Sequence, residues 1–178
     1  MRRGISEPPS NLLRQADSLA RAIFPAGCVI VLMVLASVPL GLPGRVPAVT
    51  LPCVFFWAVF RPAGLPPAAV FGIGLMQDLL TQAPLGSSVL VLLVCQGVAL
   101  RGRGFLVKLS FLTIWVIYLG LATAAALLAW VLHSALGWRL LPLAPSIYEV
   151  GLTAGLYPTL AYILAKVHQV MRRAEGPV

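Results

Sequence analysis

Apolar residues fill most of the chain in six runs, and short polar or Pro/Gly-rich breaks separate one run from the next. Runs of this kind predict helices that cross a membrane, because a transmembrane helix needs about 20 mainly apolar residues. The expected spans cover about 25–42, 46–60, 65–80, 85–100, 109–132 and 147–167. The pattern therefore predicts an all-α, polytopic integral membrane protein with six transmembrane helices, some of them short.

The second, third and fourth runs are shorter than a typical span. The second has Pro52 inside it and Arg61-Pro62 directly after it. About 15 helical residues rise only ~22 Å, less than the ~30 Å of a hydrocarbon core. The second element is therefore either extended by non-helical ends or partly re-entrant. The fifth run is so long that its helix must tilt or protrude, and the region 133–146 after it is expected to be a loop.

A different pattern precedes the first span. Ser10 can cap a helix, and apolar residues then recur at helical spacing up to about residue 24, with polar and charged residues on the opposite face. This pattern predicts an amphipathic helix on a membrane surface, and the alternative is a disordered tail. The expected organisation is an N-terminal cytoplasmic segment (1–24), a six-helix transmembrane domain (25–168) and a short basic cytoplasmic tail (169–178).

Composition indicates that lipid is the main solvent. The chain is 60% hydrophobic and only 10% charged, whereas soluble domains average about 25% charged residues. A net charge of +8 is also typical of nucleic-acid-binding proteins, but the positions of Lys and Arg give another explanation. With six spans, every Lys and Arg except Arg45 and Arg139 falls on the side of the two termini. By the positive-inside rule both termini are cytoplasmic, and no nucleic-acid partner is needed.

Asp78 is the only acidic residue between Asp17 and Glu149, and it lies near the outer end of the third span. An acid in the last turn of a helix faces the negative end of the helix dipole, so a compensating interaction is expected. The nearest donors are the unpaired amides of Gly86 and of the two serines after it, at the start of the fourth span. We therefore expect Asp78 to accept hydrogen bonds from these amides and to hold the hairpin together.

Glu149 is expected in the first turn of the sixth span, where an acid suits the positive end of the dipole. Arg45 and Arg139 are the only cations on that side, so either could pair with Asp78 or Glu149. Alternatively, all four side chains are exposed at the interface. Neither acid is expected to be catalytic, because no metal ligand or nucleophile accompanies it in the sequence.

The sixth span also carries packing signals. Gly151 and Gly155 form a GxxxG pair, which allows two helix backbones to approach closely. Pro158 cannot donate to the Ala154 carbonyl one turn earlier, so a kink is expected there. The glycine pair is either a surface for a partner helix or an internal packing face.

The remaining reactive side chains do not form a recognisable site. Cys28, Cys53 and Cys95 lie far apart in apolar runs and are interpreted as small hydrophobic residues. His133 and His168 are isolated in the sequence. We therefore expect no catalytic residue, metal site or cofactor.

The segment FGIGLMQDLLTQAPLG, residues 71–86, resembles the G-x-x-x-D-L-L-[ST]-G-x-x-L-G segment of the MreD family of rod shape-determining membrane proteins. Gln82 stands where that pattern usually has Gly. The last span is also similar, in its Tyr157-Pro158 pair and its basic cytoplasmic end. Chain length and the number of expected spans agree with the family, and residues 71–86 are the specific part of the resemblance.

The resemblance implies a non-enzymatic scaffold subunit of the bacterial cell-elongation complex in the inner (cytoplasmic) membrane, which helps to organise lateral peptidoglycan synthesis and cell shape. Such proteins are partners of MreC, a mostly periplasmic protein with one membrane span. They act with the MreB cytoskeleton, RodA and the elongation penicillin-binding protein. The family is also similar to the substrate-binding S-components of energy-coupling-factor vitamin transporters, which share six short helices. That likeness concerns the fold and not the activity.

Two other functions remain open. A small-solute transporter, or its substrate-binding membrane subunit, usually has polar or charged groups in the middle of the bilayer. Such residues are few here, and a closed pocket lined by Trp57, Gln96 and Tyr118 would favour that function. An outer groove filled by another protein's helix would instead favour a scaffold. An intramembrane enzyme is the third alternative, but the sequence shows no pair of base and nucleophile.

Overall fold

The computed structural model describes residues 10–37, 45–138 and 142–174. Within these residues the chain forms six α-helices and one short 3-10 helix, and no β-strand. The elements are α1 (Ser10–Ser37), α2 (Arg45–Phe60), η1 (Pro62–Gly64), α3 (Pro67–Thr81), α4 (Ser87–Leu106), α5 (Phe111–Gly137) and α6 (Ala144–Ala174). The all-α prediction is therefore confirmed for the described part of the chain.

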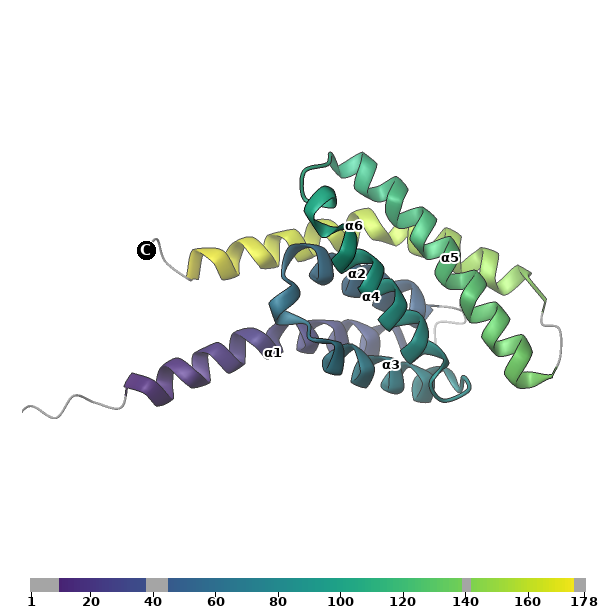
Figure 1. The fold of residues 1–178 in the computed structure, drawn as a ribbon, viewed down its shortest axis with the longest axis horizontal. Helices are drawn as coiled ribbons and strands as arrows, with labels where there is room; N and C mark the ends of the chain where they lie inside the picture. The colour runs from purple at the N-terminus through teal and green to yellow at the C-terminus, as the bar shows by residue number, and fades with distance from the viewer. Residues whose placement is uncertain (1–9, 38–44, 139–141, 175–178) are drawn as a thin grey trace, which may run out of the picture.

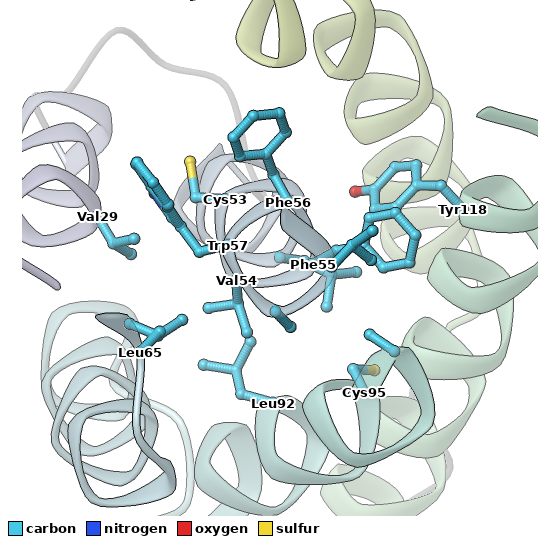
Figure 2. Close-up of a cluster of buried hydrophobic side chains, with 14 of the residues drawn as sticks. Val29, Cys53, Val54, Phe55, Phe56, Trp57, Leu65, Leu92, Cys95 and Tyr118 are labelled. Atoms are coloured by element: carbon cyan, nitrogen blue, oxygen red, sulfur yellow. The ribbon is translucent and has the colours of Figure 1, made fainter. Parts of the chain in front are cut away.

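Helix α2 lies at the centre of the core. Its residues 51–59 are all apolar and all buried. A helix that is hydrophobic on every side needs neighbours on every side. Figure 2 shows side chains leaving α2 in different directions toward the surrounding helices, namely Cys53, Val54, Phe55, Phe56 and Trp57.

The other helices surround α2. It packs against α1, α3, α4, α5 and α6, and the pairs α1–α3, α3–α4, α4–α5 and α5–α6 also contact each other. In Figure 1, α5 and α6 lie on one side of α2, and α1 and α3 lie on the other. The start of α1 and the end of α6 lie at one end of the molecule, on the left of Figure 1. The turn between α3 and α4 lies at the opposite end.

Within the described ranges, three helices are long and apolar enough to cross a membrane, namely α4, α5 and α6 over residues 144–169. Shorter apolar helical segments cover residues 24–37, 48–60 and 67–81. Large apolar side chains also lie on the surface, for example Leu79 with 65% exposure and Val116 with 55% exposure. Helix length and composition therefore indicate a membrane protein, and three of the six expected spans have full crossing length.

Helix α1 differs from the expected arrangement because it runs without a break from Ser10 to Ser37. The expected boundary between residues 24 and 25 therefore falls inside one helix. A proline inside a helix removes a backbone hydrogen bond. Here Pro25 is buried against Gly64 of η1, where an added Cβ would stand 2.7 Å from Pro25 Cγ, and the helix continues through it. The amphipathic pattern itself depends on side chains that lie outside the described residues.

Three further helices are longer than the sequence pattern predicted. Helix α4 continues to Leu106, and Arg103 in its last turn donates from Nε to the Val59 carbonyl near the end of α2 (3.0 Å). Helix α5 continues to Gly137, so much of the expected loop 133–146 is helical. Helix α6 extends to Ala174, so part of the expected basic tail 169–178 is helical as well.

Candidate functional site

Asp78 is fully buried in the last turn of α3, and donors from the start of α4 surround its carboxylate. The Gly86 amide donates to Oδ2 (2.6 Å), and the Ser88 amide donates to Oδ1 (2.9 Å). The Ser87 hydroxyl also donates to Oδ1 (3.3 Å), while the Ser87 amide bonds to the Pro84 carbonyl. The predicted hydrogen bonds are therefore confirmed for Gly86 and Ser88, and Ser87 contributes through its hydroxyl instead of its amide.

The turn between α3 and α4 has left-handed backbone geometry at two positions. Gln82, the C-cap of α3, has a φ of 54°, and Gly86, the N-cap of α4, has a φ of 93°. Glycine adopts this region without steric cost, whereas other residues do not. Gln82 therefore places a side chain at a C-cap position that favours glycine, which is also the residue usual in the MreD pattern.

Helices α3 and α4 are also in direct backbone contact below the turn. A Cβ added to Gly74 would stand 2.6 Å from Val89 Cα and 2.9 Å from Val89 N. Gly72, two residues earlier, has no atom within 4 Å of its added Cβ. The hairpin is therefore held by close packing at Gly74 and by the carboxylate of Asp78 near its tip.

His133 of α5 joins this polar cluster although it is isolated in the sequence. Its Nε2 lies 3.1 Å from the Ser87 hydroxyl, a contact between residues 46 positions apart that no motif or spacing indicates. In a catalytic triad the carboxylate orients the histidine, which then activates the serine. Here Asp78 binds the serine directly, and Ser87 is only 3% exposed. The three groups therefore form a structural link between α3, α4 and α5.

A cavity of about 470 Å³ lies beside this cluster, and we call it the hairpin cavity. Polar lining residues come from α3, α4, α5 and α6, and apolar ones come mainly from α2, α4 and α5. Its main polar lining residues are Gln77, Thr81, Ser87, Ser88, His133 and Glu149. The cavity brings together residues of five helices, and of its lining residues the sequence indicated Glu149 and, as donors to Asp78, Ser87 and Ser88.

Two groups of the hairpin cavity lack partners among the described residues. Gln77 is 5% exposed, its Nε2 donates to the Ser88 hydroxyl (3.2 Å), and its Oε1 is buried without a hydrogen bond. Glu149 has neither a hydrogen bond nor an ion pair within the described ranges. The cavity therefore presents acceptors that this part of the chain does not satisfy.

Glu149 differs from its expected position. Helix α6 begins at Ala144, with Pro145 in the first turn, so Glu149 lies in the second turn and not the first. The expected pairing of the acids with Arg45 or Arg139 involves arginine side chains outside the described residues. Asp78 receives its donors from the turn and from α4 instead.

Gly151 and Gly155 lie on an open face of α6. Both are exposed, and a Cβ added to either would meet no atom within 4 Å. The alternative of internal packing is therefore wrong for this pair. Pro158, Tyr162 and Ala165 follow at spacings of three, four and three residues, which places all five on one face of the helix. We call these five residues the α6 seam.

Pro158, Tyr162 and Ala165 of the α6 seam line an apolar groove of about 400 Å³, which we call the α6 groove. Its walls come from α2, α5 and α6. Aromatic side chains dominate the lining, which includes Phe56, Phe60, Phe111, Tyr157 and Tyr162. The groove and the glycine pair together form one continuous apolar surface along α6.

Two prolines inside helices free carbonyls that neighbouring side chains then bind. Pro158 leaves the Ala154 carbonyl without a helical donor, and the Trp115 indole of α5 donates to it from Nε1 (3.1 Å). Pro52 likewise frees the carbonyl four residues earlier, which accepts from the Thr153 hydroxyl (3.0 Å). The carbonyl freed by Pro158 thus joins α5 to α6, and the one freed by Pro52 joins α2 to α6.

The polar residues in the middle of the helices are mostly occupied by such contacts. The Tyr118 hydroxyl lies 2.7 Å from the Thr153 hydroxyl, and Gln96 Nε2 donates to the Leu65 carbonyl (2.7 Å). Trp57, Gln96 and Tyr118 are buried, and none of them lines the hairpin cavity or the α6 groove. Among the described residues these three side chains therefore pack in the core and contribute to neither of the two pockets.

The remaining reactive residues are packed as ordinary core groups. Cys53 and Cys95 are buried, Cys28 is half-buried, and all three are free thiols. His168 packs its ring against Trp57, with ring centroids 6.3 Å apart. Among the described residues, no three His, Cys, Asp or Glu side chains gather where they could hold a metal ion.

The structure thus presents a pinned hairpin, an acceptor-rich cavity beside it and an open apolar face on α6. These features are the basis for a functional interpretation. Comparison of the chain with protein-family models, with curated proteins and with solved structures gives no match.

Proposed function

We propose that this chain is a membrane scaffold subunit of the bacterial cell-elongation complex, similar to the MreD family, and that it helps to organise lateral peptidoglycan synthesis by binding partner proteins. The observation that carries this proposal is the open α6 seam. The proposed role is non-enzymatic. Asp78 and Ser87 are the best-placed polar groups, and both are buried in contacts that hold the hairpin together.

The shape of the α6 seam suits another transmembrane helix. From Gly151 to Ala165 the helix rises ~21 Å, which is most of the ~30 Å hydrocarbon core. At Gly151 and Gly155 a second helix backbone can approach closely, and the α6 groove accepts larger side chains. A segment lying on such an apolar surface must satisfy its own backbone hydrogen bonds, as a helix does. A partner with a single transmembrane helix therefore fits this surface.

We infer that this partner is an MreC-like protein with one membrane span. In this proposal the chain contacts three further components, either directly or through the MreC-like protein. They are the MreB cytoskeleton, RodA and the elongation penicillin-binding protein. The start of α1 and the end of α6 lie at the same end of the molecule (Figure 1). The distribution of Lys and Arg favours a cytoplasmic location for this end, in the bacterial inner membrane, with all six helices crossing.

The proposal is tested by affinity purification of the tagged full-length protein from native membranes in mild detergent, with partners identified by mass spectrometry. We expect an MreC-like protein together with components of the elongation synthase. The double variant Gly151→Leu/Gly155→Leu should reduce this recovery by about tenfold or more, because side chains then fill the seam. Gly97→Leu is the matched control, since Gly97 is an exposed, unobstructed glycine of α4.

Two results would contradict this proposal. Equal recovery with the double variant would exclude the α6 seam as the binding surface. Recovery of an ATPase pair and a coupling subunit would favour the second candidate, a small-solute transporter or its substrate-binding membrane subunit. The observation in favour of that candidate is the hairpin cavity, whose volume of about 470 Å³ lies in the range of small-molecule sites.

A further inference from the structure

We propose that the hairpin cavity binds a primary ammonium group carried on a short apolar stem. This inference goes beyond the scaffold role and uses residues that are separate from the α6 seam. It starts from two acceptors that line the cavity and have no hydrogen bond among the described residues, the buried Gln77 Oε1 atom and the half-buried Glu149 carboxylate. A carboxylate that is partly removed from water in a mainly apolar cavity favours a cation with N–H donors as its partner.

The hydrogen-bond directions around Ser87 make the cavity richer in acceptors. A carboxylate has no proton to donate, so the Ser87 hydroxyl is the donor in its contact with Asp78. The single hydroxyl proton is then used, and Ser87 must accept from His133 Nε2. When Nε2 carries the ring proton, Nδ1 is left as a third acceptor, on a residue that lines the cavity.

Other ligand classes fit this lining less well. Among the described residues no Lys or Arg lines the cavity, which disfavours phosphate and other anions. Glu149 and His133 do not gather with a third His, Cys, Asp or Glu among the described residues, which disfavours a metal ion. A neutral apolar molecule would leave the carboxylate and the amide oxygen unsatisfied. An ammonium, with three donors and a positive charge, matches all three acceptors.

The apolar part of the cavity identifies the rest of the ligand. Leu51, Val91, Leu92, Ala125 and Ala129 line it, opposite the polar residues of the hairpin. A volume of about 470 Å³ is within the ~300–1,000 Å³ of organic-ligand sites. An alkyl stem against these residues and an ammonium toward Glu149 would use both parts. The same chemistry is offered by a soluble alkylamine and by the headgroup of an aminophospholipid.

The test is a titration of the full-length protein in an uncharged maltoside detergent with n-butylammonium chloride, followed by calorimetry and by thermal unfolding. We expect saturable binding and a raised unfolding midpoint, and no effect of n-butanol at the same concentration. Glu149→Gln keeps the size of the side chain and should weaken binding about tenfold or more. Thr123→Val, at an exposed residue of α5 outside the cavity, should bind like the wild type.

Three results would overturn the inference: no saturable binding in the millimolar range, equal binding of n-butanol, or equal affinity of Glu149→Gln. If Glu149→Gln unfolds more readily without ligand, Gln77→Leu and the comparison of butylammonium with butanol decide the question instead. Loss of the MreC-like partner after substitution of the α6 seam would leave this titration unchanged. The scaffold proposal and the ligand proposal therefore fail independently.

The two sources of the ammonium are separated in nanodiscs. Phosphatidylethanolamine in the disc should weaken the binding of butylammonium, relative to pure phosphatidylcholine, if the lipid headgroup occupies the cavity. Native mass spectrometry should then show preferential retention of phosphatidylethanolamine by the wild type and not by Glu149→Gln. Equal butylammonium affinity in both discs assigns the cavity to a soluble amine.

Discussion

At the scale of single residues, Asp78 has no exposed surface, yet three donors of the next helix reach its carboxylate. A buried carboxylate must be hydrogen-bonded, and the first amides of a helix need acceptors outside the helix. The carboxylate of Asp78 and these amides lie on either side of a short turn, so each satisfies the hydrogen-bonding requirement of the other. This contact could be predicted from the sequence because the acid and the amides are only eight to ten residues apart.

Substitution of Asp78 should measure the strength of this link. Asp78→Ala leaves the part-buried amides of Gly86 and Ser88 without their acceptor and removes a fully buried carboxylate, which should lower the free energy of unfolding by roughly 2–4 kcal/mol. Asp78→Asn keeps one acceptor oxygen and should cost less, about 1–2 kcal/mol. Unfolding in detergent by heat or denaturant provides the measurement, with Thr123→Ala as the exposed control. Wild-type stability of Asp78→Ala would show that Asp78 does not stabilise the hairpin.

Gln82 provides the opposite test, because its substitution should stabilise the protein. A non-glycine residue in the left-handed region carries a steric cost, and Gln82 has a φ of 54°. Its side chain is exposed, so little packing is lost in Gln82→Gly. We expect a gain of about 0.5–1 kcal/mol, seen as a higher unfolding midpoint. Gly86→Ala, at a φ of 93°, should lower the midpoint, and a fall for both variants would contradict this account of the turn.

At the scale of the helices, contacts between elements close in sequence were easier to predict than contacts between distant ones. The end of α2 at Arg61-Pro62 and the break between α3 and α4 follow from local Pro and Gly signals. The continuous α1 does not, because the packing of Pro25 against Gly64 is a tertiary contact. The lengths of α4 and α6 were likewise underestimated, since a hydropathy pattern ends at the charged residues while the helix continues.

The spacing between α3 and α4 should depend on Gly74. Gly74→Ala would place a Cβ 2.6 Å from the backbone of Val89, so the two helices must separate. Overpacking of this kind typically costs about 1–3 kcal/mol. Gly72→Ala, on the same helix with no atom near the added Cβ, should be neutral or slightly stabilising. Unfolding midpoints of the two variants test the difference, and equal midpoints would mean that the hairpin tolerates a wider spacing.

The contact between α5 and α6 should show energetic coupling between Trp115 and Pro158. Trp115→Phe removes the donor to the Ala154 carbonyl and should cost about 0.5–1.5 kcal/mol. In a Pro158→Ala background the helix supplies its own donor to that carbonyl, so the same substitution should cost less. A double-mutant cycle of unfolding free energies measures this coupling. Strict additivity would show that the indole contact contributes nothing beyond packing.

At the scale of the whole molecule, the hairpin cavity was beyond sequence reasoning. Its lining comes from five helices, and Gln77 and His133 carry no local signal of their role. The α6 seam was partly visible, because the GxxxG pair is a motif, but only the fold shows that the pair is open. Periodicity and local motifs therefore predict helices and nearby contacts, whereas cavities and free surfaces depend on how distant helices pack.

The proposed six-crossing topology makes a prediction about the two ends of α3. The helix has 15 residues and rises ~22 Å, so it can cross only if the bilayer thins or its ends extend. Ala63 and Gln82 are exposed at opposite ends of it. In intact spheroplasts a membrane-impermeant maleimide should label Gln82→Cys, and should label Ala63→Cys only after permeabilisation. The wild-type protein is the control for its three native cysteines, which are buried or half-buried. Labelling of both variants from the same side would mean that both ends of α3 lie on one side of the membrane. The orientation that the positive-inside rule assigns to the following helices would then have to be reversed.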